Sequence, residues 1–450
     1  MNLVYGIKDR PSFGKTILFA LQQLLAIMAA TIAVPAIVGN GMSQTAALFG
    51  AGVGTLVYLI FTKFRSPVFL GSSFAFLGSM AAAFAGGVSM QLGYLGLILG
   101  ALFAGLVYVV IAIIVKLCGV RWINKIMPAV VIGPTVAIIG LSLAGNAIGD
   151  LFSGGLKVEG ASVCSPYVAL ICGLVTLAVT MICSVYGKKM MKMIPFIMGI
   201  LAGYILAAVF TVIGNATEND ALRVINFSLF NGITWVPEFT FLNAAKGFGE
   251  ISGSYVATIA VAYVPVAFVV FAEHIADHKN LSSIIGTDLL EEPGLHRTLL
   301  GDGIGSFAGA IFGGCPNTTY GESIGCVAIS GNASVVTILT TAILAIVISF
   351  FGPFATFLAT IPSCVMGGVC IALYGFIAVS GLKMLQKVDL NDNRNLFVAS
   401  VILIAGVGGM TLSFGSVTIT EVACALILGI LANVLLGGGK KKENGPEEEK

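Results

Sequence analysis

Long apolar runs, each about as long as a bilayer is thick, constrain this chain more than any other feature. One of them, YVATIAVAYVPVAFVVFA at 255–272, carries no charged side chain, and a helix needs about 20 such residues to cross the hydrocarbon core of a membrane. Charged residues make up 10% of the chain and hydrophobic residues 57%, whereas soluble proteins carry about 25% charged residues. These values exclude an ordinary water-soluble globule and indicate an integral membrane protein. The net charge of +2 does not suggest a nucleic-acid partner.

The runs predict an all-α polytopic protein with fourteen transmembrane segments. A polar connection, 215–253, divides them into seven and seven, and a charged tail, 438–450, follows the last. The predicted spans begin near Phe13, Thr45, Val68, Leu92, Met127, Tyr167 and Ile194, then near Ser254, Leu299, Thr319, Val335, Phe354, Leu396 and Val417.

The positive charges predict which side each loop occupies. If the N-terminus lies inside and the spans alternate, all 23 lysines and arginines fall on the inner side except Lys157, Arg223 and Lys246. Cytoplasmic loops of membrane proteins carry such an excess. We therefore expect a multi-pass protein of the inner (plasma) membrane with both termini in the cytoplasm and the connection 215–253 outside.

Seven spans followed by seven suggest two inverted repeats, 1–214 and 254–437, because an odd number of spans reverses the second copy. The third and tenth segments are both interrupted, at VFLGSSFAFLGS (68–79) and GCPNTTYGESIG (314–325). Broken helices at matching positions of two halves are the best sequence pointer to the midplane site of a transporter.

Few carboxylates lie in or beside apolar segments: Glu273, Asp277, Asp302, Glu322 and Glu421. An ionisable group in the membrane is costly, and its default interpretation is functional. Glu273 ends a long apolar run, Asp277 follows one helical turn later, and Glu322 sits in the interrupted tenth segment. With exposed backbone amides, Glu273 and Glu322 suit a small planar molecule with ring N–H and C=O groups better than an anion. Glu421 is better explained as a helix N-terminal acid.

Other polar and glycine-rich features favour structural roles. The spacing of Gly305, Gly309 and Gly313 is typical of helix packing rather than of a nucleotide-binding loop. His278 and His296 are expected in loops or at helix ends, and His274 is left open. The histidines and cysteines show no metal-ligand spacing, so neither a metal nor a cofactor is expected. No catalytic arrangement stands out, and neither an enzyme nor a channel is favoured by any feature beyond the buried carboxylates.

Several segments resemble the bacterial uracil permeases of the nucleobase–ascorbate transporter family. They are AEHIADHKNLSSIIGTDLLEEPGLHRTLLGDG with PNTTYGESIG, and also GSSFAF, LQQLLAIMAATIAVP and MGGVCIALYG. The resemblance implies a homodimer and fourteen spans in two inverted repeats. Spans 1–4 and 8–11 would form a core domain and the others a gate domain, with short strands in the third and tenth. It also implies alternating access by movement of core against gate.

The resemblance assigns roles to individual residues. Glu273 and Glu322 match the two glutamates that bind the pyrimidine, and the Gly321 backbone lies beside the second. Phe74 matches an aromatic residue on the ring, Tyr374 a tyrosine near the site, and Ala30 a small residue that leaves room for substrate.

The sequence departs from the proton-coupled members four residues after Glu273. They have histidine there, in E-H-x-G-H, whereas this chain has Asp277, as in the xanthine and ascorbate branches, some of which are sodium-coupled. We expect a uracil–cation symporter in which Glu273, Asp277 and Glu322 couple to H⁺, with Na⁺ as the alternative ion. A purine such as xanthine is the alternative substrate.

Overall fold

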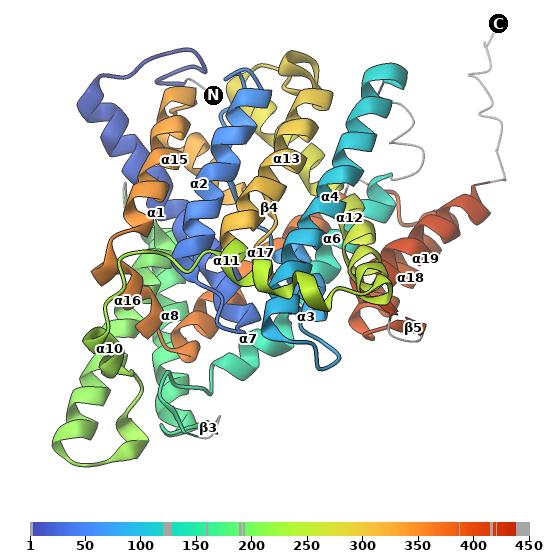
Figure 1. The fold of residues 1–450 in the computed structure, drawn as a ribbon. Coiled ribbons are helices and arrows are strands. Elements are labelled where there is room, and N and C mark those ends of the chain that lie inside the picture. Colours follow the sequence, from blue (N-terminus) through green and yellow to red (C-terminus); the bar gives the residue numbers. More distant parts are fainter. Residues whose placement is uncertain are drawn as a thin grey trace, which may run out of the picture.

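The computed structural model describes residues 3–119, 128–158, 161–188, 191, 194–386, 388–414, 417–419 and 421–437 (Figure 1). The predicted tail 438–450 and the expected start of the fifth span at Met127 lie outside these residues. Up to the connection, the helices are α1 (Phe13–Val38), α2 (Gln44–Phe61), α3 (Leu77–Ala83), α4 (Met90–Cys118), α6 (Ala129–Ser142), α7 (Ala144–Asp150), α8 (Pro166–Tyr186) and α10 (Pro195–Ala216). They continue with α11 (Thr240–Ala244), α12 (Gly253–Ile285), α13 (Leu295–Gly313), α14 (Gly321–Ser330), α15 (Val335–Ser349), α16 (Gly352–Thr360), α17 (Ser363–Leu385), α18 (Asn393–Val407) and α19 (Glu421–Leu436).

The apolar helices make the chain a multi-pass membrane protein. Within the described residues, eight helices are long and apolar enough to cross a membrane, or nine if the bent pair α15 and α16 forms one span. The number is below fourteen partly because α18 and α19 have only 15 and 16 residues. The count of fourteen therefore stays a prediction.

One predicted span boundary is wrong, and another differs by four residues. Phe354 does not start the twelfth span, because it lies in α16, which is bent by 83° from α15. The long helix begins only at Ser363, after Pro362, since the residue before a proline is disfavoured in a helix. Val417 lies in strand β6 (Val417–Ile419), which pairs with β5 (Leu412–Phe414), and helix α19 starts at Glu421.

The interrupted third and tenth segments meet as two short antiparallel strands. Strand β1 (Leu70–Ser72) pairs with β4 (Asn317–Thr319), with Leu70 opposite Thr319 and Ser72 opposite Asn317. The 3₁₀ turn η1 (Phe74–Phe76) and α3 follow β1, and α14 follows β4. Each half-helix therefore begins at the strand pair, deep in the protein, where the strands satisfy each other's backbone groups.

The helix contacts fall into two groups. The first bundle contains α1, α2, α3, α4, α12, α13, α14 and α15, and its largest interfaces join α13 to α2 and α4, which stand side by side in Figure 1. The second bundle contains α6, α7, α8, α10, α17, α18 and α19, with α6 packed on α17 and α18, and α8 on α10. Fewer contacts, mainly through α12 and α1, join the two bundles.

Glycines allow α2 and α13 to approach closely. A Cβ atom at Gly305 would lie 2.6 Å from the carbonyl oxygen of Gly54, and one at Gly309 would lie 2.8 Å from that of Gly50. No side chain fits at these distances. The expected helix-packing role of the glycine repeat in α13 is confirmed.

The connection 215–253 is held on the first bundle by aromatic side chains. It contains the turns η2 (Asp220–Leu222), η3 (Phe227–Asn231) and η4 (Ala245–Glu250), and helix α11. The Phe239 ring lies 4.9 Å from Phe49 and 5.7 Å from Phe312, measured between ring centroids, and α11 packs on α4.

Candidate functional site

A cavity of about 350 Å³ lies where the two bundles face each other. Helices α1, α12 and α14 line it from the first bundle, and α6, α10 and α17 from the second. The lining residues are Ala26, Val136, Pro195, Phe196, Glu273, Asp277, Gly321, Glu322, Gly325, Cys326, Leu373, Phe376, Ile377, Ser380 and Met384. The cavity thus combines apolar walls with three carboxylates.

Helix α12 supplies two of these carboxylates. Glu273 and Asp277 are four residues apart, so they share one face of the helix, and both reach the cavity. The helix is capped by the Ser252 side chain and ends at the left-handed Gly286. Because α12 continues to Ile285, Glu273 lies well inside the helix.

The Asp277 carboxylate is tied to the strand pair. The Thr319 hydroxyl on β4 donates a hydrogen bond of 2.6 Å to Asp277 Oδ2. The position of Asp277 is therefore set jointly by α12 and by the tenth segment.

The third carboxylate stands at the start of α14. Gly321 and Glu322 form the first turn after Tyr320, where backbone N–H groups lack helical partners and favour negative charge. The space around Gly321 is open, with no atom within 4 Å of a Cβ built there. The Gln23 amide on α1 donates to the carbonyl oxygen of Ser323 at 3.2 Å and to its hydroxyl, which fixes this turn.

Three of the residues assigned by resemblance do not line this cavity. The rings of Phe74 and Tyr374 are both buried and contact each other edge to face, with centroids 5.8 Å apart. Tyr374 is next in the sequence to Leu373, which lines this cavity, whereas Phe74 lines a different cavity. Ala30 is buried within α1. The structure therefore brings Glu273, Asp277, Gly321 and Glu322 together but leaves Phe74, Tyr374 and Ala30 outside the lining.

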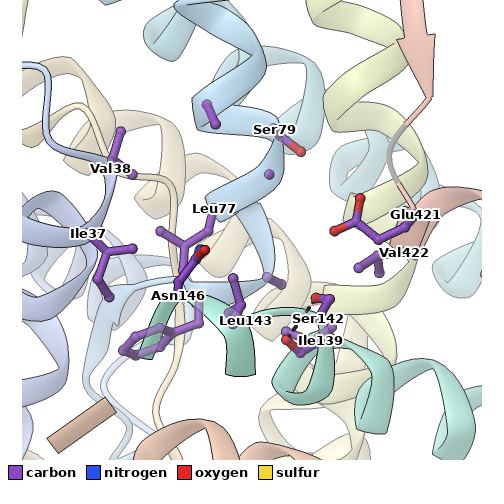
Figure 2. A pocket seen from close by; sticks show the side chains of 14 residues that line it. Ile37, Val38, Leu77, Ser79, Ile139, Ser142, Leu143, Asn146, Glu421 and Val422 are labelled. Carbon is purple, nitrogen blue, oxygen red and sulfur yellow. Dashed lines mark hydrogen bonds between the residues drawn. The ribbon is translucent and has the colours of Figure 1, made fainter. Parts of the chain in front are cut away.

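Phe74 lines a second cavity, of about 300 Å³. Its wall comes from the end of α1, from η1 and α3, from α6 and α7, and from the start of α19. Figure 2 shows Glu421, Asn146 and Ser142 among its side chains. Glu421 lies in the first turn of α19, so the expected helix N-terminal position is confirmed.

The histidines of α12 form a buried group on another face of the helix. His274 Nδ1 lies 2.7 Å from Asp302 Oδ2 on α13, and both side chains are fully buried. His278 is equally buried, so its expected place in a loop or at a helix end is wrong. Its ring stacks on His274 with centroids 4.1 Å apart. The signal in the sequence was the second i, i+4 pair, rotated by about 100° from the carboxylate pair.

The charge of the cavity restricts its ligand. No lysine or arginine is among its lining residues, and none of the ion pairs between described residues involves Glu273, Asp277 or Glu322. Three carboxylates without a cationic partner repel an anion and attract a proton, a cation or an N–H donor.

Sequence comparison places the chain among known membrane transport proteins. It is 40% identical to the uracil permease of Bacillus caldolyticus, over 97% of this chain and 95% of the relative. It is 38% identical to that of Bacillus subtilis (strain 168), over 99% and 98%, and 36% identical to that of Escherichia coli (strain K12), over 94% and 92%.

Solved structures show a shared fold at low sequence identity. The transmembrane domain of the cyanobacterial bicarbonate transporter BicA matches with a TM-score of 0.63 and 16% identity, over 96% of this chain and 99% of that one. The inward-facing murine anion transporter Slc26a9 matches with a TM-score of 0.66 and 14% identity, over 96% and 69%. The model of the permease family matches residues 14–414, and the chain therefore belongs to that family.

Proposed function

We propose that the protein is a secondary active transporter that imports uracil by symport with a cation, and that the cation is H⁺. The observation that carries the proposal is the cavity between the bundles, in which Glu273, Asp277 and Glu322 converge with the Gly321 backbone. The names of the relatives, uracil permeases over nearly the whole chain, supply the substrate.

The chemistry of uracil matches the groups in the cavity. Uracil is planar, with two ring N–H donors and two carbonyl acceptors. Glu273 and Glu322 accept hydrogen bonds from the ring N–H groups, and the Gly321 amide donates to a carbonyl oxygen. Phe74, Tyr374 and Ala30 complete the site when the bundles move, and the contact between the Phe74 ring of the first bundle and the Tyr374 ring of the second supports this assignment.

Coupling follows from the burial of carboxylates beside one another. Desolvation and mutual repulsion favour the protonated form of a carboxyl group, so uptake of a proton by the Glu273, Asp277 and Glu322 set and binding of substrate become linked. One observation favours Na⁺ as the alternative: Asp277 and the Thr319 hydroxyl bring two oxygen atoms together. Oxygen ligands suit hard cations.

Transport proceeds by alternating access. The first bundle acts as the core domain and the second as the gate domain, and their relative movement exposes the cavity to either side. The sparse contacts between the bundles support this division. The proposal includes fourteen spans in two inverted repeats, 1–214 and 254–437, and a homodimer, which the family resemblance supports. Positive charge on one side supports cytoplasmic termini in the inner membrane.

Uptake by proteoliposomes tests the function and the ion separately. The purified protein is reconstituted, and labelled uracil uptake is measured with an inward pH gradient alone and with an inward sodium gradient alone. We expect saturable uptake driven by the pH gradient and competed by unlabelled uracil but only weakly by xanthine. Uptake that needs sodium and ignores the pH gradient refutes proton coupling, and no uptake under either gradient refutes the function.

A further inference from the structure

The hydroxyl of Tyr58 occupies a central place in a buried group of polar side chains outside the cavity. Tyr58 lies on α2 and is fully buried, as are Ser66 and His278. The Tyr58 hydroxyl lies 2.7 Å from His278 Nε2 and 2.7 Å from Ser66 Oγ. One hydroxyl therefore connects helix α12 to the segment that leads into β1.

The hydrogen-bond directions in this group are determined by the carbonyl of His274. His278 Nδ1 lies 2.8 Å from that carbonyl oxygen, which only accepts, so Nδ1 carries the proton. In the neutral ring, Nε2 then accepts, and the Tyr58 hydroxyl donates to it while accepting from Ser66. Each of the three polar side chains has a defined partner.

Two hydrogen-bonded connections join the same turn of α12 to the β1–β4 strand pair. From α12, one route runs through His278, Tyr58 and Ser66 to β1. The other runs from Asp277 through Thr319 to β4, and β1 pairs with β4 at Leu70 and Thr319. His278 and Asp277 are adjacent residues, so both routes start at the same turn of α12, the one that follows Glu273.

We infer that Tyr58 is a positioning residue of the transport site: its hydroxyl, held between His278 and Ser66, fixes the rotation of α12 relative to the β1–β4 pair and thereby directs Glu273 and Asp277 into the cavity. A phenylalanine at this position would fill the same apolar space but would break the hydrogen-bonded connection from His278 to Ser66. Rotation of α12 about its axis moves the carboxylate face away from the cavity. The inference rests on the proposed function for its transport readout only.

The test compares Tyr58→Phe with a matched hydroxyl deletion, Tyr94→Phe. Tyr94 also lies in the first bundle, and its hydroxyl donates to the Asn40 carbonyl at 2.9 Å, away from the cavity. With equal amounts of folded protein, we expect Tyr58→Phe to raise the KM for uracil by about 3- to 10-fold, with Vmax within about twofold, and Tyr94→Phe to leave both unchanged. A Tyr58→Phe protein with wild-type KM overturns the inference, even if it is less thermostable.

A pair of His278 variants distinguishes positioning from packing. Glutamine can accept from Tyr58, whereas leucine fills the space without a polar atom. We expect His278→Gln to retain a KM closer to that of the wild type than His278→Leu does. Equal values for the two variants contradict the inference.

A readout without uracil separates this inference from the proposed function. A hydrophobic carbodiimide labels carboxyl groups in apolar cavities, and mass spectrometry gives the labelling rates of Glu273 and Asp277. We expect Tyr58→Phe to change the Asp277 rate by about threefold or more and Tyr94→Phe to leave it unchanged. Unchanged rates in Tyr58→Phe overturn the positioning role, whereas absence of uracil uptake by the wild type overturns only the transport proposal.

Discussion

Replacing Glu322 with glutamine tests the proposed substrate pose, because it removes the charge and keeps the shape of the side chain. Glu322 lines the cavity at the first turn of α14 and has no cationic partner among the lining residues. A hydrogen bond to a charged group contributes about 1.5–3 kcal/mol, and one between neutral groups about 0.5–1.5 kcal/mol. The difference of about 1–2 kcal/mol corresponds to a weakening of uracil binding by roughly 5- to 30-fold.

The same substitution has a smaller effect on folding. A negative charge at a helix N-terminus contributes about 0.3–1 kcal/mol, so the Tm of Glu322→Gln falls by only a few degrees at most. We therefore expect near-normal amounts of protein in the membrane and a raised KM in initial-rate uptake of labelled uracil, with the Kd of detergent-purified protein raised in parallel.

Glu292→Gln provides the matched control. Glu292 is exposed and pairs with Arg65 on the surface, outside the cavity, and exposed ion pairs contribute about 0–1 kcal/mol. Its uracil KM should equal that of the wild type. A Glu322→Gln protein with a KM within twofold of the wild type, at equal amount, would show that Glu322 does not bind the pyrimidine as proposed.

Three further substitutions test the packing, the coupling and the aromatic pair. Gly305→Ala places a methyl group 2.6 Å from the carbonyl oxygen of Gly54, so we expect a loss of about 1–3 kcal/mol, seen as a lower Tm in detergent. Thr319→Val removes the donor to Asp277; because that hydrogen bond stabilises the charged carboxylate, its loss favours protonation, and we expect the proton concentration for half-maximal uptake to fall by roughly 3- to 10-fold, measured by titrating the driving ion. Phe74→Leu removes the aromatic ring that the proposed site packs on uracil; because aromatic pairs contribute about 0.5–1.5 kcal/mol, the KM for uracil should rise by roughly 2- to 12-fold.

Each of these substitutions has a control elsewhere in the chain. Gly145→Ala adds a methyl group with no atom within 4 Å and should not lower the Tm. Thr340→Val removes a hydroxyl that only donates to its own helix and should leave the ion dependence unchanged. Phe84→Leu breaks the edge-to-face contact with Tyr94, at 5.6 Å, and should leave the KM unchanged. The corresponding expectation is contradicted if test and control variants behave alike.

Local spacing in the sequence predicted part of the local structure around the cavity. The i, i+4 separation of Glu273 and Asp277 places them on one face of any helix, and both do line the cavity. Glycine with serine or threonine in the third and tenth segments predicted breaks, and the breaks became the strands β1 and β4. The spacing of Gly305 and Gly309 predicted close helix packing, which α2 supplies.

Predictions failed where the answer depends on distant neighbours. His278 looks like the end of a span because Lys279 and Asn280 follow it, yet α2 covers its ring and offers the Tyr58 hydroxyl. A break at Ile361 and Pro362 separates α16 from α17, so an apolar stretch that reads as one span consists of two helices. Phe74 and Tyr374 are far apart in sequence, and only the folded chain shows that their rings contact each other.

The sequence alone determined that the chain lies in a membrane, because apolar runs of bilayer length and few charges leave no other stable environment. It also determined which residues share a helix face, since helical geometry repeats every 3.6 residues. The tertiary structure decided which helix faces meet. It brings Glu322 into the same cavity as Glu273 and Asp277, and it places the Tyr58 hydroxyl against His278 on another face of α12. Those contacts come from packing between segments far apart in the chain, and no local pattern of residues encodes them.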